Sequence, residues 1–276
     1  MTIIPILLYH SISDDPADWI APYTVSPEAF ARHLDLILES GRTPMSVSAL
    51  VDGLEGRSVL PAAPVVVTVD DGFADFAAAA DQLAIRDIPS TLYVTTGALE
   101  GAREQTSGWV LPPAKMLAWS QLFELAESGV EIGAHTHTHP QLDTMRAADA
   151  GREIRLSKVL LEDHLGREVS SFAYPHGFQS ARLRHDVRAA GYTSACGVMD
   201  ALSSNDDQAF CLARLTVRAS TPHAEFATWL AGRGARVAPY PEALKTKAWR
   251  MFRRGRGTRF TRGVVSTRPA RTKDGR

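Results

Sequence analysis

The densest group of side chains able to do chemistry lies in one short segment near the middle of the chain. Residues 131–140 read Glu-Ile-Gly-Ala-His-Thr-His-Thr-His-Pro, so three of the nine histidines, His135, His137 and His139, fall within five residues. They directly follow an apolar run at 130–134, which is typical of a buried strand. Neutral imidazoles that converge at a strand end are what a divalent metal requires, and the segment therefore predicts a metal site.

The backbone of this segment decides which imidazoles meet. A helical turn would place His135 and His139, which are four residues apart, on the same side. An extended backbone would instead pair His135 with His137, because strand side chains repeat every two residues. The residues alone leave both pairings open, and a polar loop that happens to be rich in histidine is the plain alternative.

Two further groups of polar residues also follow predicted strands. Residues 68–72 read Thr-Val-Asp-Asp-Gly, and residues 172–177 read Phe-Ala-Tyr-Pro-His-Gly. Two adjacent carboxylates at a buried strand end are costly unless a cation is present. One carboxylate and two histidines on a metal would remove that cost and leave positions open for water and substrate. Because Asp-Asp-Gly is also favourable turn chemistry, an ordinary turn is the alternative for the first group.

The elements that must position these motifs alternate between strand and helix. Strands are predicted at 3–9, 65–69, 91–95, 130–134, 171–174, 193–198 and 212–217, and helices at 27–40, 74–85, 120–128, 144–165, 180–190 and 222–230. Repeated strand-then-helix units predict one parallel sheet that closes into a barrel. Chemistry in such a barrel lies at the C-terminal ends of the strands, where all three motifs fall.

The composition is that of an ordinary soluble globular protein, since 45% of the 276 residues are hydrophobic and 22% are charged. No segment approaches the roughly 20 apolar residues that span a bilayer. The N-terminus lacks a basic region, and its apolar run is too short for a signal peptide. The two cysteines, Cys196 and Cys211, do not indicate a disulfide framework. We therefore expect a cytoplasmic protein.

The three motifs, at 68–72, 135–140 and 172–177, occur in the order and spacing of the polysaccharide deacetylases, also called the NodB-type domain or carbohydrate esterase family 4. Residues 8–11, Leu-Tyr-His-Ser, resemble bacterial members associated with exopolysaccharide synthesis. The likeness covers residues 3–235 and implies a distorted (β/α) barrel of about seven parallel strands. It also implies a metal-dependent hydrolase that removes acetyl groups from an acetylated sugar or polysaccharide precursor, with N-deacetylation favoured.

The resemblance implies roles for individual residues as well. Asp71, His135 and His139 would hold one divalent metal ion, most often zinc. Asp70 would be the general base that takes a proton from the attacking water.

Contacts with the substrate are implied for residues outside that group. A backbone N–H near Tyr174 resembles the donor of the family to the oxyanion, and Pro175 would stiffen the loop that carries it. Trp109, in the loop at 101–113, is the best candidate to stack on a sugar ring. The other tryptophans of the body are expected in the core or in a pocket wall.

The chain departs from the family pattern in two places. Many members carry an arginine that orients the base where this chain has Ala173. The Leu-Thr-Val-Arg segment at 215–218 lacks the histidine that supplies a general acid. As proton donor we expect His176 first and His10 second, with His137 a third choice if it turns away from the metal.

Two other function classes fit the same residues. The first is a metal-dependent amidohydrolase that cleaves a non-sugar amide on the same barrel. The second is a non-catalytic carbohydrate-binding relative, which the missing later motifs suggest. The intact Asp70 argues against the second class, because retention of a metal alone would not require a base.

Charge is distributed unevenly along the chain. Residues 243–276 hold 12 Lys/Arg and one acid, a net charge of +11, whereas residues 1–242 hold 18 Lys/Arg and 30 acids, a net charge of −12. We therefore predict a deacetylase-like catalytic domain at 1–242 and a basic tail at 243–276, which begins with a short helix and continues without order. That helix would offer Trp249 and Phe252 to an anionic membrane surface at the inner face, where lipid-linked sugar substrates would lie. A disordered solubilising tail is the alternative, and nucleic acid is not expected as a partner because no fold for it is recognised.

Overall fold

The structure is a computed structural model and describes residues 1–102 and 111–240. Trp109 and the basic tail at 243–276 lie outside the described residues, so the roles expected for them stay predictions.

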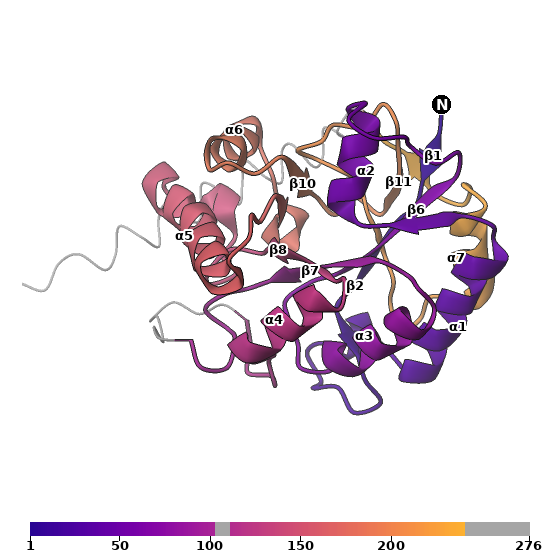
Figure 1. Ribbon diagram of the computed structural model, residues 1–276, viewed down its shortest axis with the longest axis horizontal. Coiled ribbons are helices and arrows are strands. Elements are labelled where there is room, and N and C mark those ends of the chain that lie inside the picture. Colours follow the sequence, from indigo (N-terminus) through magenta and orange to yellow (C-terminus); the bar gives the residue numbers. More distant parts are fainter. Residues whose placement is uncertain (103–110, 241–276) are drawn as a thin grey trace, which may run out of the picture.

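The apolar and β-branched runs of the sequence form one parallel sheet, as predicted (Figure 1). Seven strands follow one another in the order β10–β9–β8–β7–β6–β2–β12 and curl into a half-barrel, and β5 pairs with β6 beside that path. Their bounds are β2 Ile6–Tyr9, β5 Thr43–Met45, β6 Pro64–Val69, β7 Ser90–Val94, β8 Glu131–Ala134, β9 Ser171–Ala173, β10 Ser194–Cys196 and β12 Leu215–Thr216. The C-terminal ends of these strands therefore meet at one edge of the sheet.

One short segment joins the two ends of the sheet. Leu212 forms a parallel bridge with Cys196 of β10, and the N–H of Leu212 donates to the carbonyl oxygen of Ala195 at 3.0 Å. Three residues later, Leu215 of β12 pairs with Leu7 of β2. Residues 212–216 therefore contact both edges, and we call them the closing segment.

Helices cover the outside of the sheet. They are α1 Pro27–Glu39, α3 Phe76–Ile85, α4 Trp119–Glu127, α5 Ala147–Leu165, α6 Ala181–Ala189 and α7 His223–Leu230. Each packs against its neighbour in the order α7–α1–α3–α4–α5–α6, so the outer layer is continuous (Figure 1). Ser26 and Ser180 cap the N-termini of α1 and α6, because their hydroxyl groups accept hydrogen bonds from the backbone three residues further on.

Alternation along the strands divides the apolar residues into two cores. Val65, Val67 and Val69 of β6 belong to the large core between the sheet and the outer helices, whereas Val66 belongs to a smaller core inside the curled sheet. α2, at Val47–Leu54, contributes to the inner core and packs against β6 and β10. Because strand side chains repeat every two residues, the even-numbered residues of β6 face the inside of the sheet.

The structure also differs from the sequence prediction. The strand expected at 3–9 is two strands, β1 Ile3–Ile4 and β2, interrupted at Pro5, which has no N–H for a ladder. β1 pairs instead with β11 Ala201–Ser204, which pairs with β13 Arg236–Val237 in a small separate sheet.

Several short elements were not predicted at all. They are β3 Ser11–Ile12 and β4 Thr24–Val25, which pair with each other, the strand β5, the helix α2, and the 3₁₀ turns η1 Ala21–Tyr23, η2 Leu142–Thr144 and η3 Pro175–Gly177. Elements of two to eight residues carry too few periods of apolar residues to be recognised.

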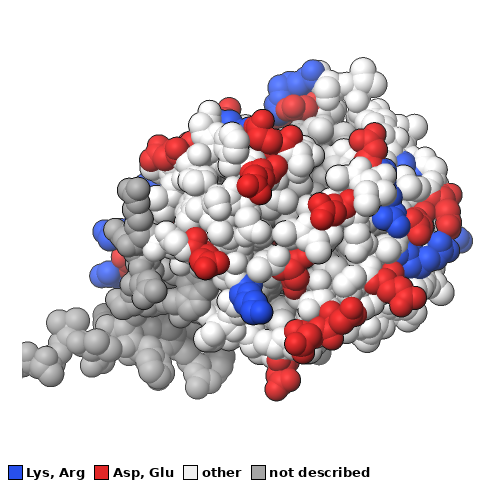
Figure 2. All heavy atoms as spheres, turned by 60° about the horizontal axis from the view of Figure 1, so that its bottom comes forward, with Lys and Arg blue, Asp and Glu red and all other residues white. Residues whose placement is uncertain are grey.

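The surface of the described residues agrees with the charge of the sequence. Acidic side chains are spread over much of the face shown in Figure 2, between neutral residues and fewer basic ones. Among the described helices, none is both long and apolar enough to cross a membrane.

Candidate active site

The three motifs meet at the C-terminal ends of the parallel strands, as predicted. Together they line a pocket of about 370 Å³. The titratable residues that they and the end of β2 contribute are His10, Asp70, Asp71, His135, His139 and His176. The pocket therefore collects carboxylates and imidazoles from the ends of four strands of one sheet, β2, β6, β8 and β9.

Alternation along the strands explains why these side chains point inward. Asp70 lies two residues after Thr68. The hydroxyl oxygen of Thr68 and Oδ1 of Asp70 both accept hydrogen bonds from the same terminal nitrogen of Arg214. Arg214 in turn lies over the ring of Tyr93, a residue of the inner core. Asp70 therefore continues the inward series of β6 beyond the last strand residue.

The loop after β8 is neither a helical turn nor a strand. Thr136 and His139 have φ angles of 68° and 60°, in the left-handed region. These two reversals bring the rings of His135 and His139 to 4.9 Å between centroids, and the N–H of His139 donates to Thr136 Oγ1 at 3.0 Å. The structure thus pairs His135 with His139 through a loop that neither regular backbone would form.

His137 turns to the other side of the loop. Its Nδ1 lies 2.9 Å from Thr96 Oγ1, and its side chain lines a separate pocket. The structure therefore does not bring His137 to the pocket of the three motifs.

Left-handed backbone is concentrated in the candidate site. Six non-glycine residues of the described chain have positive φ, and four of them belong to the three motifs: Asp71, Thr136, His139 and His176. Each such residue costs on the order of 1–2 kcal/mol, which the surrounding structure must offset. Strain of this kind gathers where side chains are held for function rather than for stability.

Glu153 of α5 fixes the histidine loop from below. Its Oε2 accepts the N–H groups of His137 and Thr138 at 3.0 and 2.8 Å, and its Oε1 accepts the hydroxyl of Thr138 at 2.9 Å. The carboxylate of Glu153 thus accepts the backbone hydrogen bonds that a neighbouring strand would accept if this loop were part of the sheet. Sequence reasoning missed it, because a glutamate in the middle of an amphipathic helix normally faces solvent.

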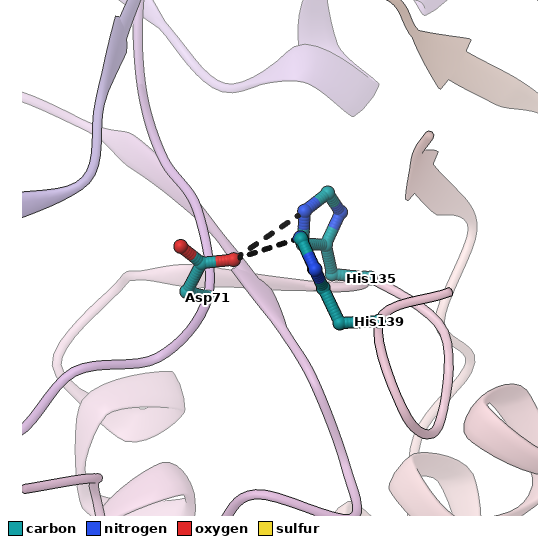
Figure 3. Close-up of side chains that lie close together, drawn as sticks. All are labelled: Asp71, His135 and His139. Carbon is teal, nitrogen blue, oxygen red and sulfur yellow. Dashed lines mark ion pairs between the residues drawn. The ribbon is translucent and has the colours of Figure 1, made fainter. Parts of the chain in front are cut away.

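Asp71, His135 and His139 are placed as ligands of one metal ion (Figure 3). Asp71 Oδ1 lies 3.6 Å from His135 Nε2 and 3.3 Å from His139 Nε2. Donor atoms that share a tetrahedral zinc at the usual bond lengths lie about 3.4 Å apart. His135 Nδ1 donates to the carbonyl oxygen of Ala173 at 2.8 Å, which leaves the lone pair of its Nε2 facing Asp71.

The electrostatics of this cluster also fit a cation. Burial, and then the charge of Asp70, raise the pKa of Asp71 well above its usual value. Burial lowers the pKa of His135 and of His139, so both imidazoles are neutral. Asp71 Oδ1 is buried and has no hydrogen-bond partner among the described residues. A divalent cation satisfies all of these groups at once, and the residues therefore fit a metal.

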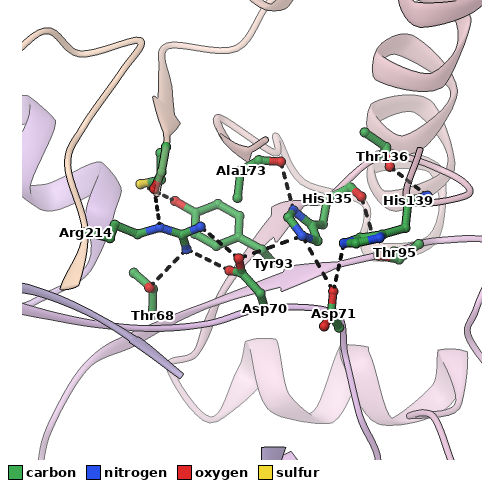
Figure 4. A network of polar contacts seen from close by, with 12 residues as sticks. Thr68, Asp70, Asp71, Tyr93, Thr95, His135, Thr136, His139, Ala173 and Arg214 are labelled. Carbon is green, nitrogen blue, oxygen red and sulfur yellow. Dashed lines mark hydrogen bonds and ion pairs between the residues drawn. The ribbon is translucent and has the colours of Figure 1, made fainter. Parts of the chain in front are cut away.

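Asp70 is bound by Arg214 of the closing segment (Figure 4). The two terminal nitrogens of the guanidinium donate to Asp70 Oδ1 and Oδ2 at 2.7 and 2.8 Å. Arg214 is fully buried, and its Nε donates to the carbonyl oxygen of Gly197 at 2.9 Å. Burial by itself raises the pKa of Asp70, but the charge of Arg214 and the hydrogen bonds that it donates oppose this, and the net pKa is lowered. Asp70 is therefore an ionised and oriented carboxylate.

Arg214 is the functional residue that sequence reasoning missed most clearly. The sequence has Ala173 in place of an orienting arginine, and in the structure an arginine arrives from another strand. The signal was present, since Leu212, Arg214 and Thr216 occupy alternate positions of a predicted buried strand. A charged residue on the inner face of such a strand requires a buried partner.

Tyr174 and Pro175 are not among the residues that line the pocket, and the substrate contacts expected of them stay predictions. The side chain of Tyr174 points to the outer core, and its hydroxyl donates to the carbonyl oxygen of Phe210 at 3.1 Å. Its N–H donates to the carbonyl oxygen of Cys196 at 3.0 Å, so this amide is already committed to the sheet. Aromatic side chains of the pocket wall come instead from Trp19 and Tyr23.

His176 and His10, the two expected proton donors, both line the pocket. The ring of His176 meets that of His139 edge to face, with 4.7 Å between centroids. Burial lowers the pKa of His10 to about 4, against the opposing charge of Asp70. His10 is therefore neutral at physiological pH, which makes it the poorer acid of the two in the resting protein.

The chain is similar to known proteins over most of its length. Residues 58–195 match the profile of a family described as polysaccharide deacetylase. YxkH of Bacillus subtilis (strain 168), provisionally named as a polysaccharide deacetylase, is 22% identical over 231 residues, which are 82% of this chain and 76% of YxkH. The Streptococcus pyogenes deacetylase PplD in complex with acetate has a TM-score of 0.70 and 23% identity, over 80% of this chain and 94% of PplD. A de-N-acetylase from Aggregatibacter actinomycetemcomitans has a TM-score of 0.70 and 19% identity, over 81% of this chain and 99% of that protein. These two likenesses show a shared fold.

Alanine in place of Asp71, His135 or His139 should abolish the uptake of a divalent metal, because each variant leaves only two of the three donors. Metal per chain, measured by mass spectrometry after equilibration with zinc and dialysis, should fall from one to near zero. His137→Ala is the matched control, since His137 belongs to the same loop and faces another pocket. Stoichiometric metal in the His135→Ala protein would contradict the assignment.

Arg214→Met should destabilise the protein by about 3–5 kcal/mol, because it leaves the charge of Asp70 buried and unpaired. The double variant Arg214→Met, Asp70→Asn should regain part of that loss, since no buried charge then lacks a partner. Denaturant unfolding of the wild type, both single variants and the double variant measures the coupling. Strictly additive losses would show that the two residues do not depend on each other.

Proposed function

Because the chain belongs to the polysaccharide deacetylase family, we propose that it is a metal-dependent hydrolase that removes acetyl groups from an acetylated sugar or polysaccharide precursor. The family makes it an enzyme of acetylated carbohydrate, and the choice of N-acetyl groups and of zinc is part of the proposal. One observation carries it: a buried Asp-His-His cluster lies beside an ionised, arginine-bound carboxylate in a single pocket.

The metal would be held by Asp71, His135 and His139. When bound, it supplies Lewis acidity, which polarises the acetyl carbonyl and lowers the pKa of a water molecule.

Asp70 is the residue placed to take the proton from the attacking water. Its Oδ2 lies 3.7 Å from His135 Nε2, so the carboxylate borders the cluster without being one of its three donors. Arg214 occupies both of its oxygens from the far side and fixes its orientation. The proton can then be accepted without rotation of the carboxylate, which is the geometric requirement for a general base.

Trp19 and Tyr23 give the pocket an aromatic wall. Sugar rings carry apolar C–H faces that pack against aromatic rings, whereas their hydroxyl groups need polar partners. This wall suits a sugar better than a short aliphatic amide. The fold shared with a deacetylase seen in complex with acetate and with a de-N-acetylase is consistent with removal of an N-acetyl group.

The leaving amine requires a proton, and we assign its donation to His176. This residue lines the pocket at the edge of His139, whereas His10 is neutral for the reason given above. No histidine occupies 215–218, so the donor must come from another strand end.

Metal-replete protein should release acetate from N-acetylated chitooligosaccharides, and a chelator should stop it. Asp70→Asn should keep the metal and lose activity by about 10²-fold or more, the usual scale for an acid–base group. Acetate release and metal content are measured on the same samples, with a non-sugar N-acetyl amide as a second substrate. Loss of metal in step with loss of activity would make Asp70 a ligand. Turnover of the amide alone would make the protein an amidohydrolase of another class.

His176→Ala should lower kcat by about 10²-fold and flatten the basic limb of the pH–rate profile, because that limb reports the group that donates the proton. His10→Ala is the matched variant, since it removes an imidazole from the same pocket. A basic limb that disappears only in His10→Ala would transfer the role to His10. A limb retained in both variants would exclude both residues.

A further inference from the structure

The pocket carries a cation that the proposed reaction does not use. Arg218 lines it, two residues beyond β12, with its side chain 42% exposed. The second arginine near the reacting groups is Arg214, which is fully buried and forms an ion pair with Asp70. Among the described residues that line the pocket, Arg218 is therefore the one that is positively charged at any physiological pH.

The guanidinium of Arg218 is held in place by two neighbours. One terminal nitrogen donates to Asp200 Oδ2 at 3.1 Å, and the guanidinium lies over the ring of Tyr23 at 5.9 Å. Asp200 is itself fixed, because its Oδ1 accepts the N–H of Thr216 at 3.2 Å. Within the described part of the chain, the remaining guanidinium edge, Nε and the other terminal nitrogen, meets no acceptor.

Stability does not explain this arrangement. A partly exposed ion pair adds little to stability once solvent screening is counted. Asp200 has a φ of 44°, in the left-handed region, which strains its backbone. The gain and the strain oppose each other, so what the pair achieves is a defined position for the guanidinium.

The position lies along the same wall as the reacting groups. Tyr23 has its ring 5.5 Å from that of His10 on one side and the guanidinium of Arg218 on the other. His10 in turn lines the same pocket as Asp70, His135 and Arg218. A sugar packed on Tyr23 would therefore reach the carboxylates with one substituent and Arg218 with another.

The positive charge of Arg218 stands against the acidic charge of the rest of residues 1–242. Residues 1–242 carry a net charge of −12, and acidic side chains are scattered over the mostly neutral face shown in Figure 2. Within the pocket, Asp70 is already matched by Arg214, and Asp71 by the proposed metal. The acidic surface around the pocket would still repel a negatively charged substrate, and a local positive group such as Arg218 offsets that repulsion. A guanidinium with a free edge suits a carboxylate or a phosphate, which it binds through two parallel hydrogen bonds.

We propose that Arg218 is a specificity residue that binds an anionic group, a carboxylate or a phosphate, carried by the acetylated sugar. The inference rests on the proposed deacetylation and adds to it a substrate class, the acidic acetylated glycans. The two groups present the same pair of oxygens to the guanidinium, and the experiment separates them.

The test compares three N-acetylglucosamine substrates: a neutral oligosaccharide, one that bears a phosphate and one that bears a carboxylate. The wild type should favour at least one anionic substrate over the neutral one in kcat/KM. In Arg218→Met this ratio should fall at least tenfold, and in Arg218→Lys by less, because lysine keeps the charge without the fork. Arg233→Met is the matched control, since Arg233 is exposed and does not line the pocket. The anionic substrate whose ratio changes identifies the group that is bound.

Binding is measured separately, by calorimetry with N-acetylglucosamine and N-acetylglucosamine 1-phosphate. Tighter binding of the phosphate by the wild type, lost in Arg218→Met and retained in Arg233→Met, would support the subsite even if no substrate released acetate. In that case the proposed function alone would fail. Acetate release with equal ratios in the wild type and Arg218→Met would overturn the subsite and leave the proposed function intact.

Discussion

Two adjacent carboxylates, Asp70 and Asp71, are buried together at the end of β6, and the site is arranged around the cost of that burial. Removing one carboxylate from water costs several kcal/mol, and a like charge beside it adds to that cost. Two different cations can offset it. Arg214 binds Asp70 from inside the sheet, and in the proposed function a metal ion held with two neutral imidazoles would offset the charge of Asp71. Asp70 would then accept the proton and Asp71 would coordinate the metal, so the two acids have different proposed roles.

Much of this arrangement follows from strand alternation and could be predicted from the sequence. The apolar run at 65–69 fixes a buried strand, and its parity places Asp70 inside the sheet. The same alternation places the side chain of His10 on the pocket side of the sheet, because Leu8, two residues earlier, also lines the pocket. Long helices with clear caps, such as α1 after Ser26, were also found close to their true bounds. Period and capping are local properties, and a single sequence contains them.

What could not be predicted depends on contacts between distant residues. Glu153 supports the histidine loop from a helix that looks like any amphipathic helix, and Arg214 reaches Asp70 across 144 positions of sequence. The pairing of His135 with His139 required two left-handed residues, Thr136 and His139, that have no distinctive sequence. The hydrogen bond of the Tyr174 amide is likewise a contact between distant residues, since its N–H donates to Cys196, whereas the parity of β9 directs its side chain outward.

The closing segment also affects the order in which the sheet and the candidate site form during synthesis and folding. Leu215 pairs with Leu7, so the last parallel strand joins the first across 208 residues, the difference between these two positions. Contacts between such distant residues form late, since the entropy of closing a long loop opposes them. During synthesis, a chain extended only as far as β10 already contains both carboxylates and all three histidines of the loop, but it lacks the guanidinium. Orientation of Asp70 by Arg214 and completion of the sheet are therefore one event, and a partly made chain lacks this oriented carboxylate.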